Sequence, residues 1–235
     1  RKFSLSLKLS PNLRDCTEAS PMKDVFFVSG IDTAIGKTYV TGYLAKLWFE
    51  QGQSVITQKL IQTGHVGISE DIEKHREIMG RGWFFEDESK LSMPEIFSYP
   101  ASPHLAAQID GREIDFQKIE SATQQLAARY DVVLLEGAGG LMVPLTETLL
   151  TIDYLAEKKY PIILVSSGRL GSINHTLLSL EVLKIRGLEL FALAYNLNDE
   201  SQDPIISKDT SRYLKHYLAQ HFPQAQWIDI PVIQG

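Results

Sequence analysis

Short apolar runs alternate along the chain with longer segments whose apolar residues are spaced as on one face of a helix. The short runs predict strands over Asp24–Ser29, Ser54–Leu60, Asp131–Glu136, Pro161–Ser166, Leu190–Asn196 and Trp227–Ile230. The longer segments predict helices over Thr38–Gln51, Asp71–Met79, Asp115–Ala128, Asn174–Arg186 and Thr210–His221, with a short helix starting at Ser102-Pro103. Strands that alternate with helices form a parallel sheet covered on both faces. The pattern therefore predicts a doubly wound, mostly parallel, three-layer α/β domain.

Composition and charge narrow the classes of function. The chain has 235 residues, 44% hydrophobic and 22% charged, which is typical of a globular protein. Its net charge is -6 and it has no basic run, so we expect no nucleic-acid partner. No apolar stretch reaches the roughly 18 residues of a membrane span, so we expect no membrane partner. The single cysteine, Cys16, excludes a disulfide within the chain and favours a cytoplasmic protein.

The first residues differ from the rest of the chain. Residues 1–21 mix basic and polar side chains and end at Ser20-Pro21, and their apolar positions are too scattered for a secretory signal. We interpret residues 1–21 as an extension that is disordered or not native, and residues 22–235 as one functional domain. A strand through Phe3–Leu9 is the alternative.

A phosphate-binding loop is the strongest motif. Gly30–Thr38 (GIDTAIGKT) lies between the first strand and the first helix, the context that such a loop requires. Its backbone N–H groups and the helix N-terminus would face the phosphates of a nucleoside triphosphate. Lys37 would reach the β- and γ-phosphates, and the hydroxyl of Thr38 would coordinate Mg²⁺. The alternative is a chance match in which Lys37 is an exposed lysine at a helix start.

Two charged residues stand at predicted strand ends. Glu136 closes a buried strand and precedes Gly137, Ala138 and Gly139. Ligands of open α/β sheets bind outside the carboxyl ends of the strands, so Glu136 is a candidate ligand of Mg²⁺. A carboxylate held by N–H groups of a turn is the alternative. Lys59, in the end of the second strand, would face a transferred phosphoryl group, or is simply solvated.

The remaining candidates have equally plain structural explanations. Asp71 is either a Mg²⁺ ligand or a first-turn acid that complements the helix dipole. Asn196 either reads a base edge or is a turn asparagine. The segment after Arg169 leads into a helix whose N–H groups suit a carboxylate, or which Ser172 or Asn174 simply caps. The six histidines show no zinc-type spacing, so we interpret them as surface or packing residues.

Taken together, these motifs resemble the dethiobiotin synthetase family from about Met22 to the C-terminus. The resemblance rests on GIDTAIGKT, QKLIQTG, Ser102-Pro103-His104, EGAGG, RLGSINH and YNLND. It implies a single P-loop NTPase-like domain that works as a homodimer and needs Mg²⁺. It also implies conversion of 7,8-diaminononanoate, CO₂ and ATP into dethiobiotin, ADP and phosphate, a late step of biotin biosynthesis.

The resemblance also assigns roles to individual positions. Lys59 and Lys37 would be catalytic, and Thr38, Asp71 and Glu136 would hold Mg²⁺. The nucleotide would contact Thr33, Ala34, Ile35, Gly36, Lys37, Thr38, Tyr39, Asp71, Glu136, Gly137, Ala138, Gly139, Asn196, Leu197, Pro231, Val232 and Ile233. The substrate would contact Thr33 and Thr63, together with Leu170, Gly171, Ser172 and Asn174 of the neighbouring subunit. The chain departs from the family pattern at Ala34, where an acidic residue is common, and in QKLIQTG, where YKPVxSG is usual.

Three other functions compete with this one. A switch ATPase of the partitioning type carries an extra lysine near the start of its loop, whereas here no lysine lies between Gly30 and Lys37. An amide-forming ligase of related fold needs a nucleophilic cysteine for glutamine hydrolysis, and Cys16 is the sole cysteine. A paralogue that kept ATP binding but lost the reaction stays open.

Overall fold

The computed structural model describes residues 24–201 and 203–232, and within them six strands form one parallel sheet in the order β2-β5-β1-β6-β7-β8. The strands are β1 (Asp24–Gly30), β2 (Val55–Lys59), β5 (Val132–Gly140), β6 (Ile162–Ser167), β7 (Leu190–Asn196) and β8 (Gln226–Ile230). A small parallel pair, β3 (Gln62–Thr63) and β4 (Ile96–Phe97), lies outside this sheet. The predicted parallel sheet is therefore confirmed.

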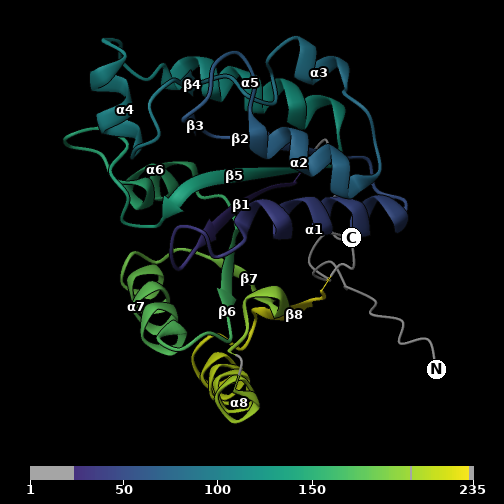
Figure 1. The fold of residues 1–235 in the computed structure, drawn as a ribbon, viewed down its shortest axis with the longest axis vertical. Coiled ribbons are helices and arrows are strands. Elements are labelled where there is room, and N and C mark those ends of the chain that lie inside the picture. Colours follow the sequence, from purple (N-terminus) through teal and green to yellow (C-terminus); the bar gives the residue numbers. More distant parts are fainter. Residues whose placement is uncertain (1–23, 202, 233–235) are drawn as a thin grey trace, which may run out of the picture.

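Helices cover both faces of the sheet and make the three predicted layers (Figure 1). They are α1 (Lys37–Glu50), α2 (Glu70–Met79), α3 (Phe85–Glu88), α4 (Pro103–Ile109), α5 (Phe116–Arg129), α6 (Thr151–Lys158), α7 (Ser172–Ile185) and α8 (Pro204–His221), with a 3₁₀ helix at Leu197–Asp199. Phe26 and Val28 pack with Leu44 of α1, whereas Phe27 belongs to the opposite core with Leu155 of α6 and Leu180 of α7. Successive residues of a strand point to opposite faces, so β1 is buried on both sides.

Two predicted boundaries are off by four residues or more, and some short elements were missed. The strand with Glu136 continues to Gly140, because Gly140 still pairs with Gly30 of β1, so EGAGG is a strand end and not a turn. Helix α8 begins at Pro204, where proline suits a first turn and Asp203 caps the N–H of Ile205. Helix α6 was not predicted, since its eight residues give too little periodic signal.

Some predictions fall outside what the structure describes. The extension at residues 1–21 and the nucleotide contact at Ile233 both lie outside the described residues. Among the helices that are described, none is long and apolar enough to cross a membrane. The cytoplasmic location stays a prediction.

Candidate nucleotide and magnesium site

The phosphate loop turns sharply between β1 and α1. Gly36 caps α1 with φ of 95°, a left-handed conformation that glycine adopts without strain. A Cβ at Gly36 would lie 2.3 Å from Nδ2 of Asn196, so the close approach also requires glycine. No side chain caps α1. An uncapped helix N-terminus behind a glycine-containing loop is the arrangement that binds phosphate.

The loop borders a cavity of about 310 Å³ at the carboxyl ends of the strands. Its lining comprises Thr33, Ala34, Gly36, Lys37, Thr38, Lys59, Ile61, Gln62, Thr63, Asp71, Glu136, Ala138 and Gly139. The structure thus brings together most of the positions that the resemblance assigned to phosphate, metal and substrate. Ile61 and Gln62 are additional lining residues, which QKLIQTG places next to Lys59.

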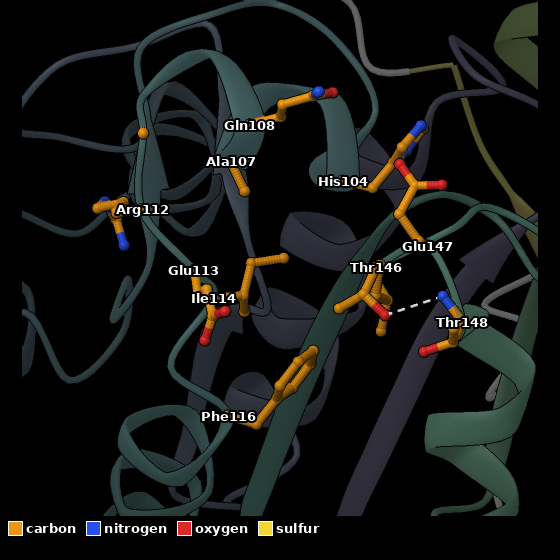
Figure 2. A pocket seen from close by; sticks show the side chains of 12 residues that line it. His104, Ala107, Gln108, Arg112, Glu113, Ile114, Phe116, Thr146, Glu147 and Thr148 are labelled. Atoms are coloured by element: carbon orange, nitrogen blue, oxygen red, sulfur yellow. Dashed lines mark hydrogen bonds between the residues drawn. The ribbon is translucent and has the colours of Figure 1, made fainter.

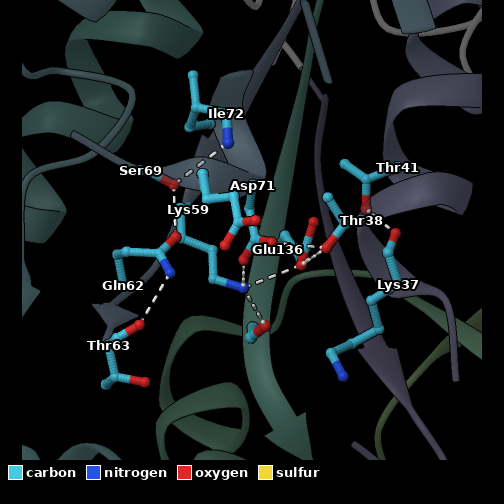
Figure 3. Close-up of polar contacts among 12 residues, drawn as sticks. Lys37, Thr38, Thr41, Lys59, Gln62, Thr63, Ser69, Asp71, Ile72 and Glu136 are labelled. Atoms are coloured by element: carbon cyan, nitrogen blue, oxygen red, sulfur yellow. Dashed lines mark hydrogen bonds and ion pairs between the residues drawn. The ribbon is translucent and has the colours of Figure 1, made fainter. Parts of the chain in front are cut away.

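Three oxygen-bearing side chains from three elements converge in this cavity (Figure 3). The Oγ1 of Thr38 in α1 lies 2.8 Å from Oδ1 of Asp71 in α2 and 3.1 Å from Oε1 of Glu136 in β5. No group of three or more His, Cys, Asp or Glu side chains suited to a metal occurs in the described residues. Mg²⁺ is usually held by one or two carboxylates together with phosphate oxygens and water, so this donor set fits Mg²⁺.

Lys59 is buried between the two carboxylates. Its Nζ lies 2.5 Å from Oδ2 of Asp71 and 2.9 Å from Oε1 of Glu136, and it donates to the carbonyl oxygen of Gly137 at 3.2 Å. Burial disfavours its charged form, but attraction by Glu136 and Asp71 outweighs burial and raises its pKa to about 12. The alternative of a solvated lysine was wrong, because Lys59 is only 5% exposed.

Lys37 is also buried, with 7% exposure, so the alternative of an exposed lysine was wrong as well. Its Nζ donates to the carbonyl oxygen of Asp32 at 3.3 Å. Burial and repulsion by Lys59 lower its pKa against the attraction of nearby carboxylates. Two buried ammonium groups that repel each other are both stabilised when an anion lies between them.

Glu136 is fully buried, and its partners are side chains rather than the N–H groups of a turn. Its Oε2 lies 2.7 Å from Nε2 of His75 in α2, while Oε1 faces Lys59 and Thr38. Burial raises the pKa of this carboxyl, but Lys59 and His75 outweigh burial and hold the pKa far below its ordinary value. His75 was predicted to be a surface or packing residue. Its spacing of four from Asp71, which puts both on one helix face, was the available signal.

Three residues that the resemblance assigns to the nucleotide, Tyr39, Asn196 and Pro231, lie close together beside the loop. Asn196 is buried, donates from Nδ2 to the carbonyl oxygen of Ile35 at 3.0 Å and accepts from the N–H of Asn198 at 3.1 Å. It therefore is a turn asparagine that also braces the phosphate loop. The carbonyl oxygen of Pro231 accepts from the hydroxyl of Tyr39 at 3.2 Å. Contacts of the base with these residues, with Leu197 and with Val232 stay predictions.

The turn before α7 does not line the cavity beside the phosphate loop. Leu170, Gly171 and Asn174 are exposed, and Ser172 is buried against the hydroxyl of Ser167 at 3.2 Å. Gly171 is the capping residue, so capping by Ser172 or Asn174 was wrong. Arg169, before this turn, pairs with Asp32 at 2.7 Å and so joins the turn to the phosphate loop.

A larger cavity of about 720 Å³ lies elsewhere, between α4 and residues 145–148 (Figure 2). His104, from the Ser102-Pro103-His104 turn, lines it together with Ile114, Phe116 and Glu147. None of the predicted site residues borders this cavity, so size alone does not locate the chemistry.

Comparison with known proteins identifies the family. A family described as an AAA domain matches residues 24–223. The ATP-dependent dethiobiotin synthetase BioD 2 of Pasteurella multocida is 52% identical over 202 residues, which cover 86% of this chain and 94% of that protein. The chain belongs to the dethiobiotin synthetase family. The dethiobiotin synthetase BioD of Chlorobaculum tepidum is also similar, with 49% identity over 207 residues, or 88% of this chain and 86% of that protein.

The family resemblance and the P-loop fold are therefore confirmed, and the names of these dethiobiotin synthetases agree with an ATP-dependent ligase of biotin biosynthesis. A solved ParA family ATPase from Chlorobium tepidum has a TM-score of 0.50 and 13% identity, covering 90% of this chain and 86% of its own. At this identity, the likeness to the ParA family ATPase shows a common fold alone and does not support the partitioning-type function for this chain.

Proposed function

We propose that this chain makes dethiobiotin from 7,8-diaminononanoate, CO₂ and ATP. The observation that carries the proposal is the convergence of Lys37, Lys59, Thr38, Asp71 and Glu136 on one cavity beside a phosphate loop. In a member of the dethiobiotin synthetase family, that cavity provides what phosphoryl transfer requires, namely positioning and neutralisation of charge.

The nucleotide would bind with its phosphates on the loop. The N-terminus of α1 and Lys37 would hold the β- and γ-phosphates, while Thr38, Asp71 and Glu136 would hold Mg²⁺. Bound Mg²⁺ would neutralise charge on the phosphate oxygens. The buried Lys59 supplies a second positive charge beside the position of the transferred phosphoryl group, where little water competes with it.

The reaction needs no side-chain nucleophile. One amine of the substrate adds to CO₂ and loses a proton, which gives a carbamate. A carbamate oxygen then attacks the γ-phosphorus of ATP, which releases ADP and forms a carbamic–phosphoric anhydride. The second amine attacks the carbamoyl carbon, loses a proton and expels phosphate, which closes the ureido ring. Lys37 and Lys59 would stabilise the negative charge on the transferred group.

The substrate would lie between the phosphate loop and a second subunit. Thr33 and Thr63 border the cavity. Thr33 also borders a groove of about 570 Å³ that Met142 and Leu178 line, and these two apolar side chains are 53% and 61% exposed. We assign a second copy of the chain to this groove. The Leu170–Asn174 turn of that second copy would then supply N–H groups to the carboxylate of the substrate bound in the first copy.

Product formation tests this proposal. The purified chain is supplied with 7,8-diaminononanoate, ¹⁴C-bicarbonate and MgATP. We expect acid-stable ¹⁴C in dethiobiotin, and one ADP released for each dethiobiotin formed. Binding of ATP without labelled product would instead favour the paralogue that lost the reaction.

A further inference from the structure

A continuous set of buried polar contacts runs behind the metal-binding face of Glu136. Nδ1 of His75 lies 2.9 Å from Oγ1 of Thr57 in β2, and Nε2 of His75 lies 2.7 Å from Oε2 of Glu136. Nη1 of Arg76 lies 2.8 Å from the same Thr57 oxygen. Thr57, His75 and Glu136 are fully buried and Arg76 is 3% exposed, so little water reaches these contacts.

The chemistry of the two ends fixes the direction of the hydrogen bonds. A guanidinium donates and cannot accept, so Arg76 donates to Thr57. An ionised carboxylate accepts and cannot donate, so Nε2 of His75 carries the proton shared with Glu136. The hydroxyl of Thr57 is the partner of the other ring nitrogen, Nδ1. Each polar atom in the series has a partner in this arrangement, as a buried site requires.

The far end of the series is held by α3 and by the loop that follows it. Asp87 of α3 accepts from both Nε and Nη2 of Arg76 at 2.8 Å, and it also accepts from the hydroxyl of Ser92 at 2.6 Å. A bidentate pair of this kind restricts the guanidinium plane. The fixed guanidinium restricts the hydroxyl of Thr57, and this hydroxyl in turn restricts the His75 ring.

We propose that His75 is a positioning residue for the metal site. It binds Oε2 of Glu136 and thereby keeps Oε1 directed at Thr38 and Lys59. The terminal torsion of a glutamate side chain has only broad preferences, so the carboxylate needs an external partner to keep one oxygen on the cation. The inference rests on the magnesium site of the proposed function and assigns a role to a residue outside that site.

Metal affinity in the presence of nucleotide tests this inference without the full reaction. Mn²⁺ serves as the probe for Mg²⁺, and its binding to the full chain with a non-hydrolysable ATP analogue is followed by electron paramagnetic resonance. Binding of the same analogue in EDTA is measured separately. The variants are His75→Leu, which removes the donor, and His75→Gln, whose amide N–H can replace Nε2–H.

We expect His75→Leu to weaken Mn²⁺ binding by about 10- to 100-fold, the usual effect of losing a partner of a metal ligand. Nucleotide affinity in EDTA should stay at the wild-type value, and His75→Gln should recover most of the Mn²⁺ affinity. The inference is overturned if His75→Leu binds Mn²⁺ as the wild type does, if it loses nucleotide affinity equally in EDTA, or if His75→Gln is no better.

Two further comparisons separate positioning from folding. If His75→Leu does not fold, the variants Thr57→Val and Thr57→Ser test the proposal instead. Only serine keeps the hydroxyl, so equal Mn²⁺ affinities in these two variants would contradict the proposal.

Leu218→Ala, at a buried core position of α8, is the control for lost stability. It should unfold at a lower temperature with unchanged Mn²⁺ affinity, and a matching loss of affinity would contradict the proposal. If the variants bind Mn²⁺ as expected here but the wild-type chain makes no dethiobiotin, the proposed function is refuted and this inference stands.

Discussion

Lys59 lies within 3 Å of both Asp71 and Glu136, and all three line the cavity with Lys37. Two carboxylates and two lysines balance in net charge, but they come from four different elements. A buried ion remains charged only where partners compensate its lost hydration. Each of these residues therefore helps the others to remain charged. A bound polyphosphate and its metal ion would add further charges of both signs to this site.

Replacing Lys59 with methionine tests the catalytic role that we propose for it. Methionine keeps most of the volume and removes the charge beside the transferred phosphoryl group, so we expect kcat for dethiobiotin formation to fall at least about 100-fold. ATP binding, measured by calorimetry, should persist, because Lys37 and the phosphate loop remain. Lys74→Met, at an exposed lysine of α2, is the matched control and should keep full activity. Wild-type turnover in Lys59→Met would contradict the assignment.

Gly36 allows a test of the contact between the phosphate loop and Asn196. In Gly36→Ala the new Cβ would lie 2.3 Å from Nδ2 of Asn196, in addition to the strain of φ at 95°. We expect a loss of about 1–3 kcal/mol of unfolding free energy and a marked loss of ATP affinity. Urea unfolding and calorimetry measure the two effects.

Gly52→Ala is the matched control for Gly36. Gly52 has nearly the same φ, 91°, but nothing lies within 4 Å of a Cβ at that position. Its backbone strain should lower stability by roughly 1 kcal/mol and leave ATP affinity unchanged. Equal ATP affinities in the two variants would show that the approach of Asn196 is unimportant for binding.

Elements differ in how far the sequence predicts them. β7 has the predicted bounds Leu190–Asn196, because a long apolar run buried on both faces has clear ends. Helix α6 has only eight residues, and β3 and β4 have two each, so periodicity could not reveal them. The rule that ligands bind at the carboxyl ends of parallel strands predicted that Glu136 lies at the same edge as the phosphate loop. It did not predict the contact of His75 with Glu136, which depends on how α2 packs against β2 and β5.

The link between α2 and α3 predicts a dependence of stability on pH. Burial raises the pKa of Asp87, but hydrogen bonds and attraction from Arg76, with bonds from Ser92 and Phe84, outweigh burial and lower it. The folded pKa is below the ordinary value of 3.8, so Asp87 stabilises the fold above that value. This stabilisation is lost as pH falls from about 5 towards the folded pKa.

Asp87→Asn tests that contribution. It leaves the buried Arg76 without its carboxylate, so we expect a loss of about 3–5 kcal/mol of unfolding free energy at pH 7. The decline in stability below pH 5 should be less steep than in the wild type, because one titrating group is gone. Urea unfolding between pH 3 and pH 7 measures both quantities, and an unchanged slope would be inconsistent with the lowered pKa of Asp87.

At the scale of the whole molecule, exposed apolar side chains gather beside the phosphate loop. Leu178 of α7 and Met142 line the groove that includes Thr33. Leu170, 81% exposed, stands in the turn that precedes α7. This turn does not line the cavity beside the phosphate loop, so the proposed substrate contacts need the turn of a second copy.

Leu178→Glu tests the proposed homodimer. A charge in an apolar interface is costly to bury, so we expect the variant to sediment as a monomer. ATP binding should persist, since the loop and its lysines belong to one subunit, while dethiobiotin formation should fall more than tenfold, roughly the effect of 1.4 kcal/mol or more. Ile205→Glu, at an exposed position of α8, is the control and should remain dimeric and active. A dimeric, fully active Leu178→Glu would contradict the proposed interface.

The path of an oxygen atom tests the central claim most directly, namely that the cavity places a carbamate against the γ-phosphorus of ATP. The chain is mixed with 7,8-diaminononanoate, MgATP and ¹⁸O-labelled CO₂, and the reaction is stopped before the label exchanges with water. If the carbamate oxygen attacks phosphorus, each phosphate released with dethiobiotin carries one ¹⁸O atom. Dethiobiotin formed together with unlabelled phosphate would contradict the account.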